Sequence, residues 1–206
     1  FVYEVGAELV LAAPSARRPP PSPRCTMADT ATATGPAAVD FEGTWHRNAG
    51  RSAGVAEALV ARGHPREVAD ERSAAPYIQR WERTEGGDVG VWTVTTFKTD
   101  GVTPRRTLVY PLGDWEEEYE GASTLFGGAT TSPGEPQRQT VPRHTSWERE
   151  PQAVGGLAHV TTSATLLGHE ESRRFLADDG SMVLRRMYRE TGSEEAAVSD
   201  EVFERR

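Results

Sequence analysis

Residues 89–98 read VGVWTVTTFK, a run of β-branched and aromatic residues whose types alternate along the chain. Such alternation is typical of a β-strand, because successive side chains of a strand point to opposite faces of the sheet. Similar segments recur after Pro76, each bounded by Gly, Pro, Asp or Ser in turns. We therefore expect nine strands in this region. They span approximately residues 77–83, 89–98, 105–111, 115–119, 137–148, 157–166, 171–177, 182–190 and 196–204.

The segment before these strands has a different pattern. A short strand is predicted at residues 41–46, and apolar residues at helical spacing predict helices at 53–62 and 66–73. Gly63 ends the first helix, and Pro65 suits the first turn of the second. Two helices are therefore expected between the first strand and the second.

A ten-stranded antiparallel meander leaves long unpaired edges unless the sheet closes on itself. Short Gly-rich and Asp-rich connections favour hairpins between consecutive strands. One longer connection, residues 121–136, is rich in Gly, Ser, Thr and Pro and is predicted to be a surface loop. The sequence thus predicts a mainly β fold, a ten-stranded antiparallel up-and-down barrel with a two-helix lid between strands one and two. A barrel of this width holds a cavity.

Composition excludes several functional classes. The chain has 206 residues and a formal net charge of -8, whereas binding to phosphate backbones needs a basic face, so no nucleic-acid partner is expected. No apolar run is long enough to cross a bilayer. The single cysteine, Cys25, allows no intramolecular disulfide and no thiolate zinc cluster.

The first forty residues differ in composition from the rest. The run RRPPPSPR at 17–24 cannot continue a helix or donate regularly to a sheet, so residues 1–40 are predicted to be a disordered extension of a barrel at 41–206. We prefer Met27 as the biological start, with a translated leader before it. A targeting remnant is the alternative, although acidic residues within the apolar stretch 1–13 are unusual for one.

The order of short motifs from Phe41 to the C-terminus resembles the intracellular fatty-acid-binding protein family, lipid-binding proteins with a calycin-type barrel. The motifs are FEGTW at 41–45, TTFK at 95–98, LG at 112–113, RRFL at 173–176, DGSMV at 179–183 and VFER at 202–205. The resemblance implies a cytoplasmic, monomeric carrier without a cofactor. Its partner would be a fatty acid or similar hydrophobic small molecule inside the barrel, and the helical lid would make transient contact with membranes.

The resemblance also implies ligand-binding residues. Family members orient the ligand's head group with an arginine on the eighth strand, matched by Arg174, and with an Arg-x-Tyr triplet on the last strand. Here the triplet position reads EVF at 201–203, so the usual anchor is half lost. Arg186 and Tyr188 occupy cavity-facing positions in the resembling proteins, and Arg186 is the candidate replacement cation. The predicted ligand-binding set is Arg174, Arg186, Tyr188, Phe97, Glu201 and Phe203, with Phe97 at the portal.

Several alternatives stay open for these residues. The segment RMY at 186–188 is itself a candidate for the family triplet, which would make the residues after Glu190 an added tail. Arg186 and Glu201 are equally suited to a structural ion pair. Phe97 suits the core as well as the portal, and the run EEE at 116–118 reads as a solvated strand.

Two further functions use the same barrel differently. Dinoflagellate luciferases contain a similar barrel and histidines that respond to pH, a role for which His64, His144 and His159 are candidates. No metal-ligand spacing or nucleophile motif accompanies them, so no catalytic or metal-binding residues are predicted. The other function is an interaction or subunit module whose cavity is filled by side chains.

Overall fold

The computed structural model describes residues 39–84, 90–120, 138–165 and 167–206. The predicted extension before Val39, its start at Met27 and the predicted loop at 121–136 lie outside the described residues.

The described elements appear in the expected order and confirm the predicted fold, with ten antiparallel strands and two helices between the first strand and the second. The strands are β1 (Gly43–Arg47), β2 (Ile78–Arg83), β3 (Trp92–Phe97), β4 (Pro104–Tyr110), β5 (Gly113–Glu120), β6 (Arg138–Arg149), β7 (Leu157–Ala164), β8 (Gly168–Leu176), β9 (Met182–Glu190) and β10 (Ala197–Arg205). The helices are α1 (Val55–Ala61) and α2 (Arg66–Ala74), and a short 3₁₀ turn, η2 (Val154–Gly156), precedes β7.

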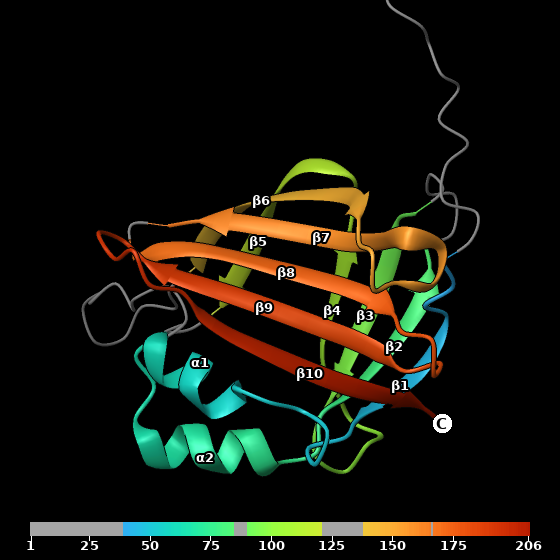
Figure 1. The fold of residues 1–206 in the computed structure, drawn as a ribbon, viewed down its shortest axis with the longest axis horizontal. Helices are drawn as coiled ribbons and strands as arrows, with labels where there is room; N and C mark the ends of the chain where they lie inside the picture. The colour runs from blue at the N-terminus through green and yellow to red at the C-terminus, as the bar shows by residue number, and fades with distance from the viewer. Residues whose placement is uncertain (1–38, 85–89, 121–137, 166) are drawn as a thin grey trace, which may run out of the picture. The chain divides into compact units, whose positions relative to one another are not determined.

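One curled sheet contains all ten strands, in the order β4-β3-β2-β1-β10-β9-β8-β7-β6-β5 (Figure 1). The first and last strands meet in this order, with Trp45 of β1 opposite Arg205 of β10. Strand β10 also pairs with β9 along its length. The alternative in which the residues after Glu190 form a tail is therefore wrong, because these residues supply the strand that joins the two ends of the meander.

Strands β4 and β5 are the two edges of the sheet, and no backbone ladder joins them in the described residues. Side chains connect them instead. Arg106 Nη2 donates to the carbonyl oxygen of Glu118 at 2.8 Å and contacts Glu117 Oε1 at 2.8 Å. The rings of Tyr110 and Trp115 meet edge to face with centroids 5.6 Å apart. Side-chain contacts thus bridge the two edge strands of the curled sheet.

Helix α1 lies against β10, and small residues allow the close approach (Figure 1). Ala53, just before the helix, exchanges two backbone hydrogen bonds with Asp200 of β10, at 2.8 and 2.9 Å. Gly54 follows with φ of 70°, and a Cβ atom there would collide with the carbonyl oxygen of Val198. A glycine is therefore required where the chain leaves β1 and enters the lid.

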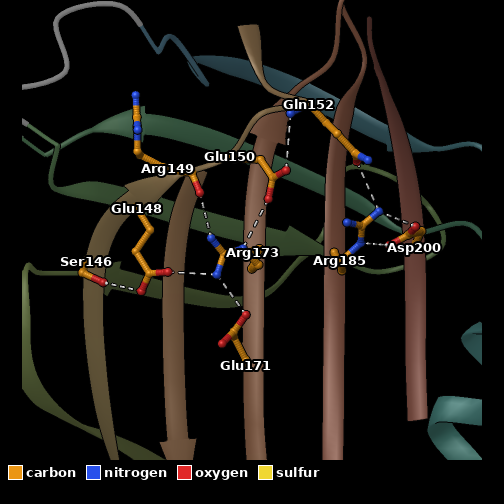
Figure 2. Close-up of polar contacts among 9 residues, drawn as sticks. All are labelled: Ser146, Glu148, Arg149, Glu150, Gln152, Glu171, Arg173, Arg185 and Asp200. Carbon is orange, nitrogen blue, oxygen red and sulfur yellow. Dashed lines mark hydrogen bonds and ion pairs between the residues drawn. The ribbon is translucent and has the colours of Figure 1, made fainter. Parts of the chain in front are cut away.

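The outer face of the sheet balances its charges locally. Arg173 on β8 contacts Glu148 at 2.9 Å, Glu171 at 3.1 Å and Glu150 at 3.4 Å, as Figure 2 shows. Arg185 on β9 likewise contacts Asp200 of β10 at 2.8 Å. Partly exposed pairs of this kind each contribute about 0–1 kcal/mol, so their main effect is to leave few charges without a counterion.

Aromatic side chains fill one end of the barrel. Trp45 is 1% exposed, and its indole Nε1 donates to the carbonyl oxygen of Phe41 at 2.7 Å. Phe41 in turn packs against Trp81 and Trp92, with ring centroids 5.2 and 5.7 Å away. The core of this region comprises Val39, Phe41, Trp45, Trp81, Trp92, Val94, Met182, Leu184 and Phe203.

Truncating this aromatic base is expected to destabilise the fold strongly. Trp45→Ala should lower the free energy of unfolding by about 3–5 kcal/mol, since it leaves a large cavity and removes a buried hydrogen bond. The control is Val102→Ala, at a position 76% exposed, which should change it by less than about 0.5 kcal/mol. Urea unfolding monitored by circular dichroism measures both, and equal effects would contradict the assignment of Trp45 to the base.

Candidate ligand-binding site

The inward-facing side chains change from apolar to polar along individual strands. On β9 the series runs Met182, Leu184 and Arg186, and on β8 it runs Leu176, Arg174, Ser172 and Glu170. On β10 it runs Phe203, Glu201 and Ser199. The apolar ends belong to the aromatic base, and the polar ends lie toward the helices, where Arg62 follows α1 and contacts Glu170 at 3.4 Å. The interior thus has an aromatic half and a charged half.

The charged half surrounds a cavity of about 260 Å³, here called the inner chamber. Its lining includes six arginines, Arg62, Arg105, Arg106, Arg143, Arg174 and Arg186. Two carboxylates, Glu117 and Glu170, also line it, together with Tyr77, Tyr110 and Leu108. Cations outnumber anions around this chamber.

A second space of about 570 Å³, here called the lid cavity, lies beneath the helices. Val55 and Leu59 of α1 line it, as do Phe97 and Pro76. The two spaces are neighbours, because Arg62, Tyr77, Arg105 and Arg186 line both. The volume of the lid cavity falls within the ~300–1,000 Å³ typical of small-molecule sites.

Glu201 lies at the junction of the two spaces and is paired on both sides. Its Oε2 contacts Arg47 Nη1 at 3.0 Å, and its Oε1 contacts Arg186 Nη2 at 3.5 Å. The glutamate side chain is 4% exposed. The structural ion pair considered for Arg186 and Glu201 is therefore present, and Arg47 is a second cation that shares the carboxylate.

Glu117 corrects the interpretation of 116–118 as a solvated strand. Its side chain is 4% exposed. The carboxylate contacts Arg143 Nη2 at 2.6 Å and Arg106 Nη2 at 2.8 Å. Glu117 shares the inward face of β5 with Trp115, two residues before it, so strand alternation buries it while Glu116 and Glu118 stay exposed. Its burial is tolerated because two guanidinium groups neutralise it.

Arg174, the residue matched to the family's head-group arginine, has an incomplete set of partners. Its guanidinium carbon lies 4.9 Å from the ring centroid of Tyr110 and 5.5 Å from that of Trp81. Nη2 donates to the Tyr110 hydroxyl at 3.4 Å, whereas buried Nε and Nη1 have no hydrogen-bond partner within the described part of the chain. Unlike Arg173 on the outer face, Arg174 has no described carboxylate within 4.0 Å. It therefore keeps donors for an external acceptor.

His159 lies opposite Arg174 across the β7–β8 ladder and corrects the expectation of a histidine that titrates near neutrality. Burial, reinforced by the charge of Arg174, lowers its pKa to about 3. Neither ring nitrogen has a hydrogen-bond partner among the described residues, and the ring packs 5.2 Å from Trp147. Burial, with Arg72 and Arg62, also lowers the pKa of His64 in the lid.

The predicted site residues separate into two groups. Arg174, Arg186, Phe97 and Glu201 line the connected cavities. Tyr188 lies farther along β9, where its hydroxyl donates to the carbonyl oxygen of Leu167 at 3.3 Å. Phe203 is fully buried in the aromatic base. The structure thus brings four of the six together at the cavities, and their role in ligand binding stays a prediction.

Besides Glu117, sequence reasoning missed five charged residues of the inner chamber, Arg62, Arg105, Arg106, Arg143 and Glu170. A signal for one of them was present, because Arg143 shares its face of β6 with the partly buried Trp147 at even spacing. Nothing in the local pattern identified Arg62, since its partner Glu170 belongs to a distant strand.

Comparison with solved structures identifies the fold. The crystal structure of the wild-type fluorescent protein UnaG matches with a TM-score of 0.53 and 19% identity, over 81% of this chain and 97% of that chain. A structure described as As-p18, an extracellular fatty acid binding protein, matches with a TM-score of 0.50 and 13% identity, over 81% of this chain and 96% of that chain. The chain has the fold of the fatty-acid-binding proteins.

No family model matches the sequence, and no curated protein matches it significantly. Within the described ranges, neither helix has the length and apolar character needed to cross a membrane. The same residues contain no group of three His, Cys, Asp or Glu side chains placed to bind a metal ion.

The burial of neutral His159 predicts a specific dependence of stability on pH. An unfolded imidazole takes up its proton near pH ~6.5, whereas folded His159 does so only near 3. Between these two pH values the unfolded state binds more protons than the folded state. Lowering the pH therefore stabilises the unfolded state and lowers the free energy of unfolding, by up to about 1.4 kcal/mol per pH unit.

His159→Phe should remove this contribution and make the free energy of unfolding fall less steeply between pH ~6 and ~4. Urea unfolding of both proteins across this range measures the slopes. The comparison at pH ~8, where the imidazole is almost entirely neutral in both states, isolates the effect of the substitution on packing. Parallel curves between pH ~6 and ~4 would contradict the assignment.

Proposed function

We propose that the protein carries an apolar small molecule with an acidic group, a fatty acid or similar amphiphile, inside its barrel. The observation that carries this proposal is that two unlike spaces lie side by side. The inner chamber presents Arg174 with buried, unpartnered donors among the described residues, and the neighbouring, larger cavity is lined by Val55, Leu59 and Phe97. The acidic group binds in the first space and the apolar body in the second.

The energetics of such a ligand suit this division. Withdrawing an acyl chain from water contributes about 0.8 kcal/mol per methylene, whereas a hydrogen bond to a charged group contributes about 1.5–3 kcal/mol. The lid cavity therefore supplies most of the affinity, and Arg174 fixes the orientation of the ligand. Phe97 and Leu59 contact the part of the ligand nearest the portal.

Binding is favoured over the two alternative functions by specific features. The inner chamber and the lid cavity leave space that a barrel used only as an interaction module would fill. An arginine stays protonated and cannot exchange protons as a general acid or base, and both glutamates that line the inner chamber are paired with arginines. A protein of the same fold is described as an extracellular fatty acid binding protein, which gives a precedent for this use.

The setting of the carrier belongs to the proposal as well. We propose a cytoplasmic monomer whose helices α1 and α2 admit the ligand and make transient contact with membranes. This part of the proposal rests on the family resemblance of the sequence.

Displacement of a fluorescent fatty acid by oleate tests the proposed function. Oleate should displace the probe from the full chain, and Arg174→Gln should weaken oleate binding by about 10- to 100-fold, the equivalent of one charged hydrogen bond. The matched control is Arg189→Gln, on an exposed position of the same sheet, which should bind oleate as the unaltered protein does. Failure of the unaltered protein to bind the probe or oleate would overturn the proposal.

A further inference from the structure

The charges around Arg174 do not balance among the described residues. Glu170 contacts Arg62, and Glu201 is shared between Arg186 and Arg47. With Arg174, four guanidinium groups thus face two carboxylates in the described part of the chain, an excess of two positive charges. The imbalance is local, because the chain as a whole has a formal net charge of -8.

Each glutamate of the region is already engaged. Glu117 contacts Arg106 and Arg143, and Glu170 contacts Arg62. Arginine cannot relieve the imbalance by losing a proton, because its guanidinium stays charged at any pH that proteins meet. Unpaired charges in such surroundings are costly unless a counterion or solvent compensates them.

Unused donors surround the same space. Within the described residues, buried nitrogens without a hydrogen-bond or ion-pair partner include Nε of Arg62, Nε and Nη1 of Arg174 and Nε of Arg186. These three residues come from the lid, from β8 and from β9, and all three line the inner chamber. A single carboxylate carries one negative charge, fewer than the three guanidinium groups that supply these donors.

The lowered pKa of Glu170 reflects the positive charges of several arginines around it. Burial alone would raise the pKa of this carboxyl group, but the combined charges of Arg62, Arg186, Arg143 and Arg174 hold the pKa below its ordinary value. Four guanidinium groups therefore act on one position in the chamber. An acidic group on a ligand entering beside Glu170 meets the same field.

The size of the chamber limits what enters it. At about 260 Å³ it is smaller than the ~300–1,000 Å³ typical of sites that enclose a whole ligand. It suits a compact polar group, while the neighbouring lid cavity of about 570 Å³ takes the apolar remainder.

We propose that the polar end of the ligand carries two negative charges, as a phosphate monoester or a pair of carboxylates does, and that Arg62, Arg174 and Arg186 bind it in the inner chamber. This inference rests on the proposed carrier function and narrows its ligand class. A fatty acid, with one charge, neutralises less of the excess and leaves more of the donors unused.

Matched ligands test the number of charges directly. Dodecyl phosphate and dodecyl sulfate share a chain and a tetrahedral head, but near pH 7.5 the phosphate carries nearly one charge more because its second pKa is about 6. Isothermal titration calorimetry of the full chain, below the micelle concentrations of both ligands, should give an affinity for the phosphate at least about tenfold higher. The preference should largely disappear at pH ~5, where the phosphate is a monoanion.

A second pair of ligands distinguishes the source of the two charges. Dodecylmalonate should bind more tightly than tetradecanoate, which has the same alkyl chain and one carboxylate fewer, if two carboxylates satisfy the chamber. A preference within either pair supports the inference, and the larger preference identifies the head group. Equal affinities within both pairs would overturn the two-charge inference while leaving the carrier function standing, and no binding of any of the four ligands would overturn both.

Charge-altering variants separate electrostatics from damage to the fold. Arg62→Gln lowers the excess of positive charge and should reduce the preference for dodecyl phosphate over dodecyl sulfate by about threefold or more. Glu170→Gln raises the excess of positive charge and should increase this preference. Structural damage would weaken binding of both ligands in both variants. Arg189→Gln, on an exposed position, should leave the ratio of the two affinities unchanged. A change of this ratio in the same direction in Arg62→Gln and Glu170→Gln would overturn the inference.

Discussion

A guanidinium group inside a protein stays charged, so every inward-facing arginine needs an anion, an aromatic face or solvent. The outer face meets this need locally, since Arg173 contacts three carboxylates. The interior meets it only in part. Arg174 lies over two aromatic rings, and the glutamates around the inner chamber are fewer than its arginines. This incomplete compensation is the feature on which the account of the site depends.

The remainder of the barrel makes such an interior possible. The aromatic base around Phe41 and Trp45 buries large side chains at one end, and its packing stabilises the sheet independently of the charged half. Lid and chamber then meet through Arg62, which follows α1 and contacts Glu170 on β8. A polar, spacious half is less favourable for stability than a filled core, and sites of function commonly carry such a cost.

Strand alternation and turn chemistry were sufficient to predict ten strands and the two-helix lid, because both signals are local. They also place Arg174 and Arg186 on inward faces once the resemblance is used. Glu117 was misassigned because three consecutive glutamates resemble a solvated strand, and its two arginine partners lie on other strands. The charge balance of the chamber is a sum over residues that only the folded sheet brings together, so local patterns do not contain it.

A crystal structure with 12-bromododecanoic acid tests the central claim most directly, because anomalous scattering from bromine locates the tail independently of the head. The account predicts the carboxylate within hydrogen-bond distance of Arg174 and the bromine in the lid cavity beneath Leu59 and Phe97. The opposite orientation, with the carboxylate at the portal and the bromine among the arginines, would contradict it.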